Sequence, residues 1–226
     1  MIERRRLALP IAAAILLLAA LAFALLAGSG SSKHTTTGTG ATATTASTPA
    51  EGAQAGSGGF DGAAVPAPAQ APEFALEDQY GRPVSLRSLR GQPVVIAFLY
   101  AHCGAACVLI AQQIRGAVNE LPHPVPVLLI SADPAGDSPA AVRRFLASVS
   151  LSGRVHYLTG TRTQLAPVWR AYRVRPASAG RATFDNYATV LLLDPAGRER
   201  VLYGQEQLTP EALAHDIAKL QPASGG

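Results

Sequence analysis

The chain has few cysteines, few charged residues and few aromatic ones. Among its 226 residues are 2 cysteines, 15% are charged and 6% are aromatic. Two cysteines are too few for a disulfide-rich secreted scaffold or a four-cysteine zinc module. The charged fraction lies well below the roughly 25% of an average soluble domain, whereas the apolar fraction of 48% is ordinary. This combination indicates that part of the chain is not a packed domain.

Basic residues are too few and too concentrated to indicate nucleic-acid binding. The formal net charge is +4, and Arg4, Arg5 and Arg6 supply three of those charges at one end. We therefore expect no nucleic-acid partner. Long apolar runs are equally scarce, because only one is long enough to cross a bilayer, and this excludes a polytopic transporter.

That run covers residues 7–27 and contains no charged residue. As a helix it is ~31 Å long, about the thickness of a hydrocarbon core. The three arginines at positions 4–6 precede it, and the next basic residue is Lys33. The positive-inside rule predicts a cytoplasmic N-terminus and an extracytoplasmic remainder. Residues 1–27 are thus expected to be a single-pass anchor in the cell membrane.

A cleaved signal peptide is the alternative for the same segment. Ala22, Phe23 and Ala24 fit the small-x-small pattern of a cleavage site. The apolar run is longer than the roughly 7–15 residues of a usual signal core. For this reason we expect the anchor.

Residues 28–72 consist mainly of Gly, Ser, Thr, Ala and Pro. They include three charged residues, Lys33, Glu51 and Asp61, and one aromatic residue, Phe60. Such a composition buries too little apolar surface to offset the entropy of ordering the chain. The sequence therefore predicts a disordered linker between the anchor and the next segment.

Residues 73–222 have the pattern of one folded domain, followed by a short tail at 223–226. Apolar runs typical of strands cover residues 74–76, 84–86, 93–100, 125–131, 155–158, 188–194 and 199–203. Helical periodicity or start signals mark residues 103–121, 138–145, 163–172 and 209–220. This alternation predicts an α/β fold, in which a central mixed sheet is covered by helices on both faces.

Cys103 and Cys107 are the only thiols of the chain, and they lie where the strand at 93–100 meets the next helix. A helix N-terminus favours negative charge, so both are candidates for thiolate chemistry. Their spacing of four permits a disulfide or a shared soft metal ion. The alternative is a purely structural disulfide or two buried cysteines that serve as small apolar residues. A loop as short as this one gains little stability from cross-linking. We therefore predict a redox-active or metal-binding pair.

The surrounding segments resemble the SCO/SenC family of membrane-anchored copper proteins. The matching segments are FALEDQYGRPVSL at 74–86, LRGQPVV at 89–95, FLYAHC at 98–103 followed by Cys107, SADPAGDSP at 131–139 and LLDPAGR at 192–198. The resemblance extends over residues 73–220. It implies a thioredoxin-like fold, a copper site of two Cys thiolates and one distant His, and a role in building the copper site of cytochrome c oxidase. An oxidase subunit is then a possible partner.

Within this resemblance Cys103 and Cys107 match the two thiolate ligands, but the histidine does not match. Counting back from the LLDPAGR segment, its position falls at Asn186. An amide is a poor ligand for Cu(I), which prefers thiolate and imidazole. His102 adjoins Cys103 and is a weak candidate for the third ligand. The prolines that usually follow each cysteine in the family are replaced by Gly104 and Val108.

Two principal functions follow from these residues. The first is copper binding and delivery through Cys103 and Cys107. The second is a metal-independent thiol–disulfide oxidoreductase that acts on the cysteines of a partner. The missing histidine favours this second function. Two features count against a general oxidoreductase. The cysteine spacing is not Cys-x-x-Cys, and Ala188 lies at the approximate place of the thioredoxin cis-proline. A third hypothesis is a non-catalytic interaction domain.

Other polar and aromatic residues receive structural interpretations. Asp133 is expected in a turn, Asp137 and Ser138 at the start of a helix, and Trp169 in the core. Four further histidines are assigned no role: His34, His123, His156 and His215.

Overall fold

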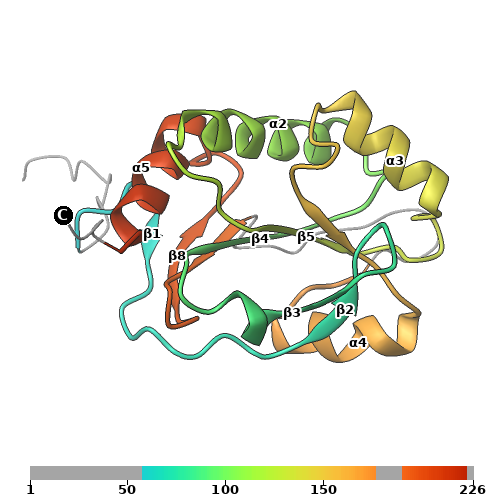
Figure 1. Cartoon of the computed structure of the whole chain (residues 1–226), viewed down its shortest axis with the longest axis horizontal. Helices are drawn as coiled ribbons and strands as arrows, with labels where there is room; N and C mark the ends of the chain where they lie inside the picture. Colours follow the sequence, from blue (N-terminus) through green and yellow to red (C-terminus); the bar gives the residue numbers. More distant parts are fainter. Residues whose placement is uncertain (1–57, 177–189, 223–226) are drawn as a thin grey trace, which may run out of the picture. The chain divides into compact units, whose positions relative to one another are not determined.

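The structure, a computed structural model, describes residues 58–176 and 190–222 (Figure 1). They form a six-stranded sheet of strand order β1-β8-β7-β4-β5-β6 and a separate two-stranded sheet. The large sheet consists of β1 (Ala63–Ala64), β4 (Val94–Leu99), β5 (Val127–Ser131), β6 (His156–Leu158), β7 (Val190–Leu193) and β8 (Glu199–Tyr203). The small sheet consists of β2 (Ala75–Glu77) and β3 (Pro83–Ser85), and the short 3₁₀ helix η2 (Leu86–Leu89) follows it.

The large sheet is mixed. β4 pairs in parallel with β5, and β5 pairs in parallel with β6. β7 pairs antiparallel with β4 on its other side, and β8 and β1 continue that half antiparallel. β4 is therefore central, which explains why its sequence is apolar throughout rather than alternating.

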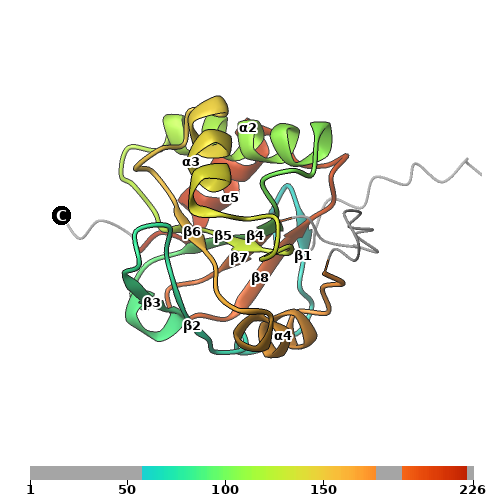
Figure 2. The ribbon, with the colours of Figure 1, turned by 90° about the vertical axis from the view of Figure 1, so that its right-hand side faces the viewer.

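Helices cover both faces of this sheet. They are α2 (Ala105–Glu120), α3 (Pro139–Ser148), α4 (Arg162–Ala171) and α5 (Pro210–Leu220). Figures 1 and 2 show α2, α3 and α5 over one face, and α4 with the β2–β3 hairpin over the other. This is the mixed sheet with helices that the sequence predicts, and it is consistent with a thioredoxin-like fold.

Alternation along β4 divides the core into two halves. Val95 and Leu99 belong to the cluster that also contains most of the buried residues of α2, α3 and α5. Val94 and Ile96 belong to the cluster on the α4 face. Because side chains of a strand alternate between its faces, one short strand supports both layers.

The folded domain begins earlier than the predicted boundary at residue 73. Phe60 is only 6% exposed, and β1 pairs with β8. The Phe60 ring lies under the cations of Arg200 and Lys219, at 5.6 and 5.3 Å from its centroid. The buried aromatic side chain and the strand pairing therefore place this stretch against the domain, although its composition resembles a linker.

The predicted membrane span at residues 7–27 lies outside the described residues. Within the described ranges, no helix combines the length and the apolar character needed to cross a membrane.

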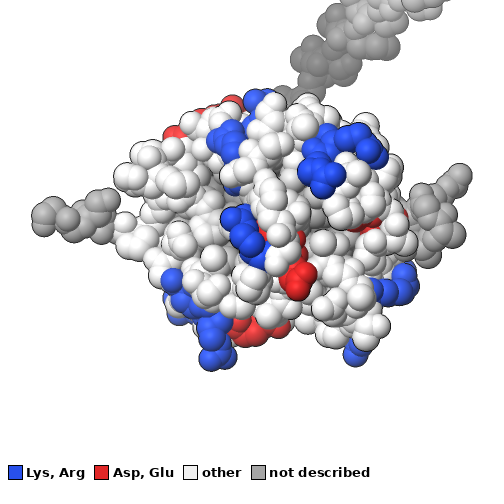
Figure 3. Space-filling view, turned by 45° about the vertical axis from the view of Figure 1, so that its right-hand side comes forward, with Lys and Arg blue, Asp and Glu red and all other residues white. Residues whose placement is uncertain are grey.

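Charged side chains on the face shown in Figure 3 lie in small, separate groups of either sign. Among the described residues, this face therefore has no large patch of a single charge.

Candidate functional site

The two cysteines form a disulfide between the end of β4 and the first turn of α2. Cys103 lies in the loop after β4, Cys107 is the third residue of α2, and their Cα atoms are 5.7 Å apart. The disulfide places the two predicted site residues together. Cys103 is partly exposed, whereas Cys107 is completely buried. A sulfur atom of a partner therefore meets Cys103 first.

The helix that carries Cys107 starts without a side-chain cap. Gly104 is its N-cap, with φ 79° and ψ −150°, a backbone conformation that favours glycine. No side chain accepts a hydrogen bond there, and the first turn contains no acidic residue. The N–H groups of this turn therefore keep their partial positive charge beside the Cys107 sulfur. This arrangement favours negative charge on that sulfur.

Asp137 is buried behind the cysteine loop, and only 4% of it is exposed. Its Oδ1 accepts a hydrogen bond of 2.7 Å from the backbone N–H of Ala101. Its Oδ2 accepts hydrogen bonds from the hydroxyls of Ser131 and Tyr157, at 2.5 and 2.7 Å. Burial raises the pKa of Asp137, and these hydrogen bonds offset only part of that effect. The carboxyl group thus fixes the chain two residues before Cys103.

Asp137 therefore differs from the expected helix cap. Ser138 alone caps α3, because its side chain accepts a hydrogen bond from the N–H of Ala141. The expected turn at Asp133 is present, since its carbonyl oxygen accepts hydrogen bonds from the N–H groups of Gly136 and Asp137. The sequence alone did not indicate that Asp137 reaches across to the cysteine loop.

His102 is exposed and lies beside this turn. A Cβ atom placed on Gly136 would lie 3.6 Å from His102 Nδ1 and 2.7 Å from a carboxylate oxygen of Asp133. Glycine at this position therefore leaves room for the Asp133 carboxylate, whereas the contact with His102 would be an ordinary van der Waals one. In this disulfide-bonded form, His102 makes no three-residue metal cluster with the cysteines among the described residues.

The position that the family resemblance gives to the third ligand, Asn186, lies outside the described residues, as do Ala188 and His34. His123 is exposed, in the segment between α2 and β5. His156 is partly buried, and its Nδ1 lies 3.4 Å from Asp78 Oδ2.

Trp169 lies in the core, as the sequence predicts. It is 3% exposed, and its Nε1–H donates a 2.8 Å hydrogen bond to the carbonyl oxygen of Ser131. The same residue, Ser131, donates its hydroxyl to Asp137. Trp169 therefore stabilises the end of β5 and is not part of an exposed docking surface.

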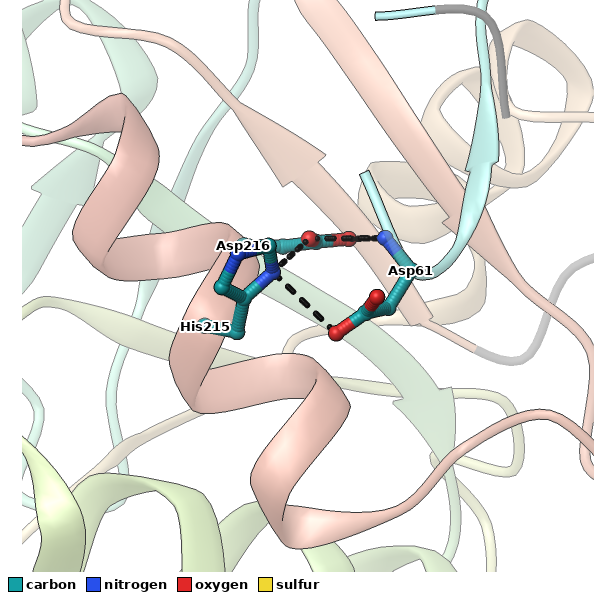
Figure 4. A group of neighbouring side chains, drawn as sticks. All are labelled: Asp61, His215 and Asp216. Carbon is teal, nitrogen blue, oxygen red and sulfur yellow. Dashed lines mark hydrogen bonds and ion pairs between the residues drawn. The ribbon is translucent and has the colours of Figure 1, made fainter. Parts of the chain in front are cut away.

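A second polar cluster consists of Asp61, His215 and Asp216 (Figure 4). His215 Nδ1 lies 3.1 Å from Asp61 Oδ2 and 3.0 Å from Asp216 Oδ1. The buried Asp216 carboxylate also accepts hydrogen bonds from the N–H groups of Asp61 and Gly62 and from the Tyr203 hydroxyl. These hydrogen bonds use both oxygens of the Asp216 carboxylate. We therefore interpret the cluster as a structural connection between the start of β1 and α5. The sequence does not predict this cluster, because Asp61 falls in the predicted linker and His215 receives no role.

Comparison with known proteins places this geometry in context. The family model described as SCO1/SenC matches residues 63–221. The mitochondrial SCO2 homolog of Bos taurus is 29% identical over 160 residues, which cover 65% of this chain and 59% of that protein. The mitochondrial SCO1 homolog of Homo sapiens is 27% identical over 160 residues, covering 66% and 52%. The chain thus spans between half and three-fifths of the length of these relatives.

Solved structures agree with the fold. ScoI of Bradyrhizobium japonicum, solved with copper bound, is 31% identical with a TM-score of 0.54, covering 67% of this chain and 99% of that one. BsSco, described as a member of the Sco family of cytochrome c oxidase assembly proteins, is 19% identical with a TM-score of 0.58, covering 70% and 96%. At that identity the second comparison supports the fold alone.

Proposed function

The chain belongs to the SCO1/SenC family, and on that premise we propose that it binds copper through Cys103 and Cys107 and delivers it during assembly of a cytochrome c oxidase copper site. The observation that carries this proposal is that the chain's two cysteines, Cys103 and Cys107, lie together at the start of α2. Two thiolates are the soft donors that Cu(I) prefers. The copper bound to ScoI, a relative at 31% identity, supports the same cargo here.

Copper is the substrate of this function, and the disulfide has to open before copper binds. A dithiol reductant opens the Cys103–Cys107 bond by thiol–disulfide exchange, becomes a disulfide itself, and leaves two thiols on this chain. Binding of Cu(I) then releases both protons, because the ligands are thiolates. The uncapped first turn of α2 stabilises the negative charge that develops on Cys107. Copper loading and disulfide formation are therefore alternative uses of the same two sulfur atoms.

The third copper ligand is proposed to be His102. Of the histidines in the described ranges, it alone adjoins a cysteine in the sequence. It is exposed, so its ring can turn without breaking a core contact. Asn186 at the family position offers Cu(I) only an amide.

We also propose that residues 1–27 anchor the protein in the cell membrane, with the domain on the extracytoplasmic side. The uncharged run at 7–27 and the preceding arginines support this orientation. An oxidase subunit in the same membrane is then within reach of the domain.

The second candidate function is a thiol–disulfide oxidoreductase, favoured by the unequal exposure of the two cysteines. A partner thiolate attacks the accessible Cys103 sulfur, the disulfide breaks, and the electron pair leaves with Cys107. A second partner thiolate then attacks the mixed disulfide and releases Cys103. The partner loses two electrons and gains a disulfide, while this chain gains two thiols; the reverse sequence reduces a partner.

Anaerobic Cu(I) titration of the full chain against bicinchoninate tests the first function. We expect the reduced chain to bind one Cu(I), and Cys103→Ser and Cys107→Ser to bind about a hundredfold more weakly or worse. Losing a ligand costs more than the 10–100-fold typical of losing a residue that only supports a ligand. An affinity of the unaltered chain no better than that of Cys103→Ser would end the copper proposal. The reduction potential of the pair in glutathione buffers then tests the second function.

A further inference from the structure

A hollow of about 400 Å³ lies beside the disulfide, between the start of α2 and α3. The residues that form it come from both sides of Cys103, from α2 and from α3. They include Ala101, His102, Gly104, Val108, Arg144 and Phe145. The hollow is thus continuous with the loop that carries the more exposed cysteine.

A second hollow on the molecule, of about 620 Å³, lies at Leu109 and residues 204–207. Its lining includes no neighbour of either cysteine in the sequence, and its one charged residue is Glu206. The hollow beside the disulfide is therefore the better placed of the two to receive a molecule that reacts at Cys103.

The hollow beside the disulfide carries one formal charge, and it is positive. Arg144 supplies this charge, and no carboxylate lines the hollow. Arg144 is exposed, and within the described ranges it forms no ion pair or hydrogen bond. Val108 and Phe145 add apolar surface. An extended segment with apolar residues and a carboxylate matches this combination.

We propose that this hollow binds an acidic, cysteine-bearing peptide segment of a partner protein, with a carboxylate on Arg144 and the partner sulfur at Cys103. The inference rests on the proposed function, since only a partner that exchanges copper or electrons with Cys103 needs a sulfur there. It adds that the partner is chosen by a negative charge near its cysteine.

The two neighbouring arginines of α3 provide a matched test. Arg144 lines the hollow, whereas Arg143 does not, and both are exposed. The substitutions Arg144→Glu and Arg143→Glu change the net charge equally and lie on the same helix. Any effect of net charge alone therefore appears in both variants, and recognition within the hollow appears only in Arg144→Glu.

The probes are two short peptides, each with one cysteine joined to 2-thiopyridine in a mixed disulfide. One peptide carries Asp and Glu beside the cysteine, and the other carries Asn and Gln. In the reaction the Cys103 thiolate attacks the peptide sulfur and releases pyridine-2-thione, whose absorbance reports the rate. Cys107 then attacks Cys103 and releases the peptide thiol. The reduced full chain, in mild detergent, is compared with both variants at low and at high salt.

We expect the unaltered chain and Arg143→Glu to react about three- to tenfold faster with the acidic peptide at low salt. High salt should reduce this preference, because the charges are exposed. Arg144→Glu should lose or reverse the preference, whereas Arg143→Glu should keep it. Equal rates with the two peptides, or equal effects of both substitutions, would overturn the proposal. Self-association of the chain that Arg144→Glu abolishes would also overturn it, by assigning the hollow to a second copy.

Failure of the proposed function gives a different result. A reduced pair that does not react even with neutral dithiodipyridine contradicts the exchange chemistry, not the docking. Docking is then decided by fluorescence anisotropy with the same two peptides, labelled and with Ser in place of Cys. Preferential binding of the acidic peptide that disappears only in Arg144→Glu supports the docking site, and equal binding of both peptides rejects it.

Discussion

The backbone N–H of Ala101 donates a 2.7 Å hydrogen bond to Oδ1 of the buried Asp137. Ala101 follows β4 and precedes Cys103 by two residues. The other oxygen of Asp137 accepts the hydroxyls of Ser131, which ends β5, and Tyr157, which lies in β6. One carboxyl group therefore connects β5, β6 and the residues that follow β4, near the disulfide.

Replacing Asp137 with Asn is expected to destabilise the domain by about 1–3 kcal/mol. The amide has one acceptor oxygen for the donors that Asp137 now satisfies, and its NH₂ group faces them. Urea unfolding of the reduced and oxidised chain measures the loss. A matched change at the exposed end of the same turn, Ser138→Ala, removes only a helix cap and should cost about 1 kcal/mol. A loss at Asp137 no larger than at Ser138 would contradict the bridging role.

The stability difference between the unaltered chain and Asp137→Asn should depend on pH. Burial raises the folded-state pKa of Asp137 above its ordinary value of 3.8. The contribution of Asp137 to the free energy of unfolding is therefore fully present below pH 3.8 and declines as the pH rises through the raised pKa. Asp78 and Asp194 titrate in both proteins and cancel in the difference. Urea unfolding from pH 4 to 7 should show the advantage of the unaltered chain shrinking, and a growing advantage would contradict the assignment.

Replacing His102 with Ala should weaken Cu(I) binding if His102 is the third donor, whereas His123→Ala should not. Both histidines are exposed, and only His102 lies beside a cysteine. We expect about a tenfold loss, or 1.4 kcal/mol, for His102→Ala. Competition with bicinchoninate measures both variants. Equal affinities would assign the site to the two thiolates alone.

Restoring a histidine at position 186 should strengthen Cu(I) binding by about tenfold or more, because imidazole replaces an amide at the family ligand position. Asn119→His on the exposed surface of α2 is the matched control. The same competition titration compares the two variants. No gain at position 186, or the same gain at 119, would show that the alignment of Asn186 with the family ligand is wrong.

Replacing Phe60 with Ala should cost about 3 kcal/mol of unfolding free energy, since the buried ring packs against Arg200 and Lys219. Val65→Ala, on a partly exposed residue of the same stretch, should cost much less. Urea unfolding compares the two. A loss below about 1 kcal/mol for Phe60→Ala would place the start of the stable domain after this residue.

Much of the fold follows from periodicity. The apolar run around β4 predicts a central strand, and the spacing of apolar residues after Cys103 predicts α2. Ser138 and Thr209, each followed by proline, mark the starts of α3 and α5 correctly. These signals are local, so the sequence carries them directly.

The contacts that the sequence did not predict are long-range. Asp61 meets His215 and Asp216, which lie more than 150 residues away. Asp137 reaches Ala101 across 36 residues. Such pairs depend on how the elements pack, and a polar residue before a helix is equally consistent with a cap. The hollow beside Cys103 is likewise visible only once α2 and α3 are in place.

The most direct measurement compares copper binding by the two redox forms of the same chain. The Cys103–Cys107 disulfide and the copper site use the same sulfur atoms, so the forms differ only in whether those atoms are free. Native mass spectrometry after anaerobic addition of Cu(I) counts the bound ions. The account predicts one copper on the reduced chain and none on the disulfide form. Equal loading of both forms would contradict it, because the copper would then be held elsewhere.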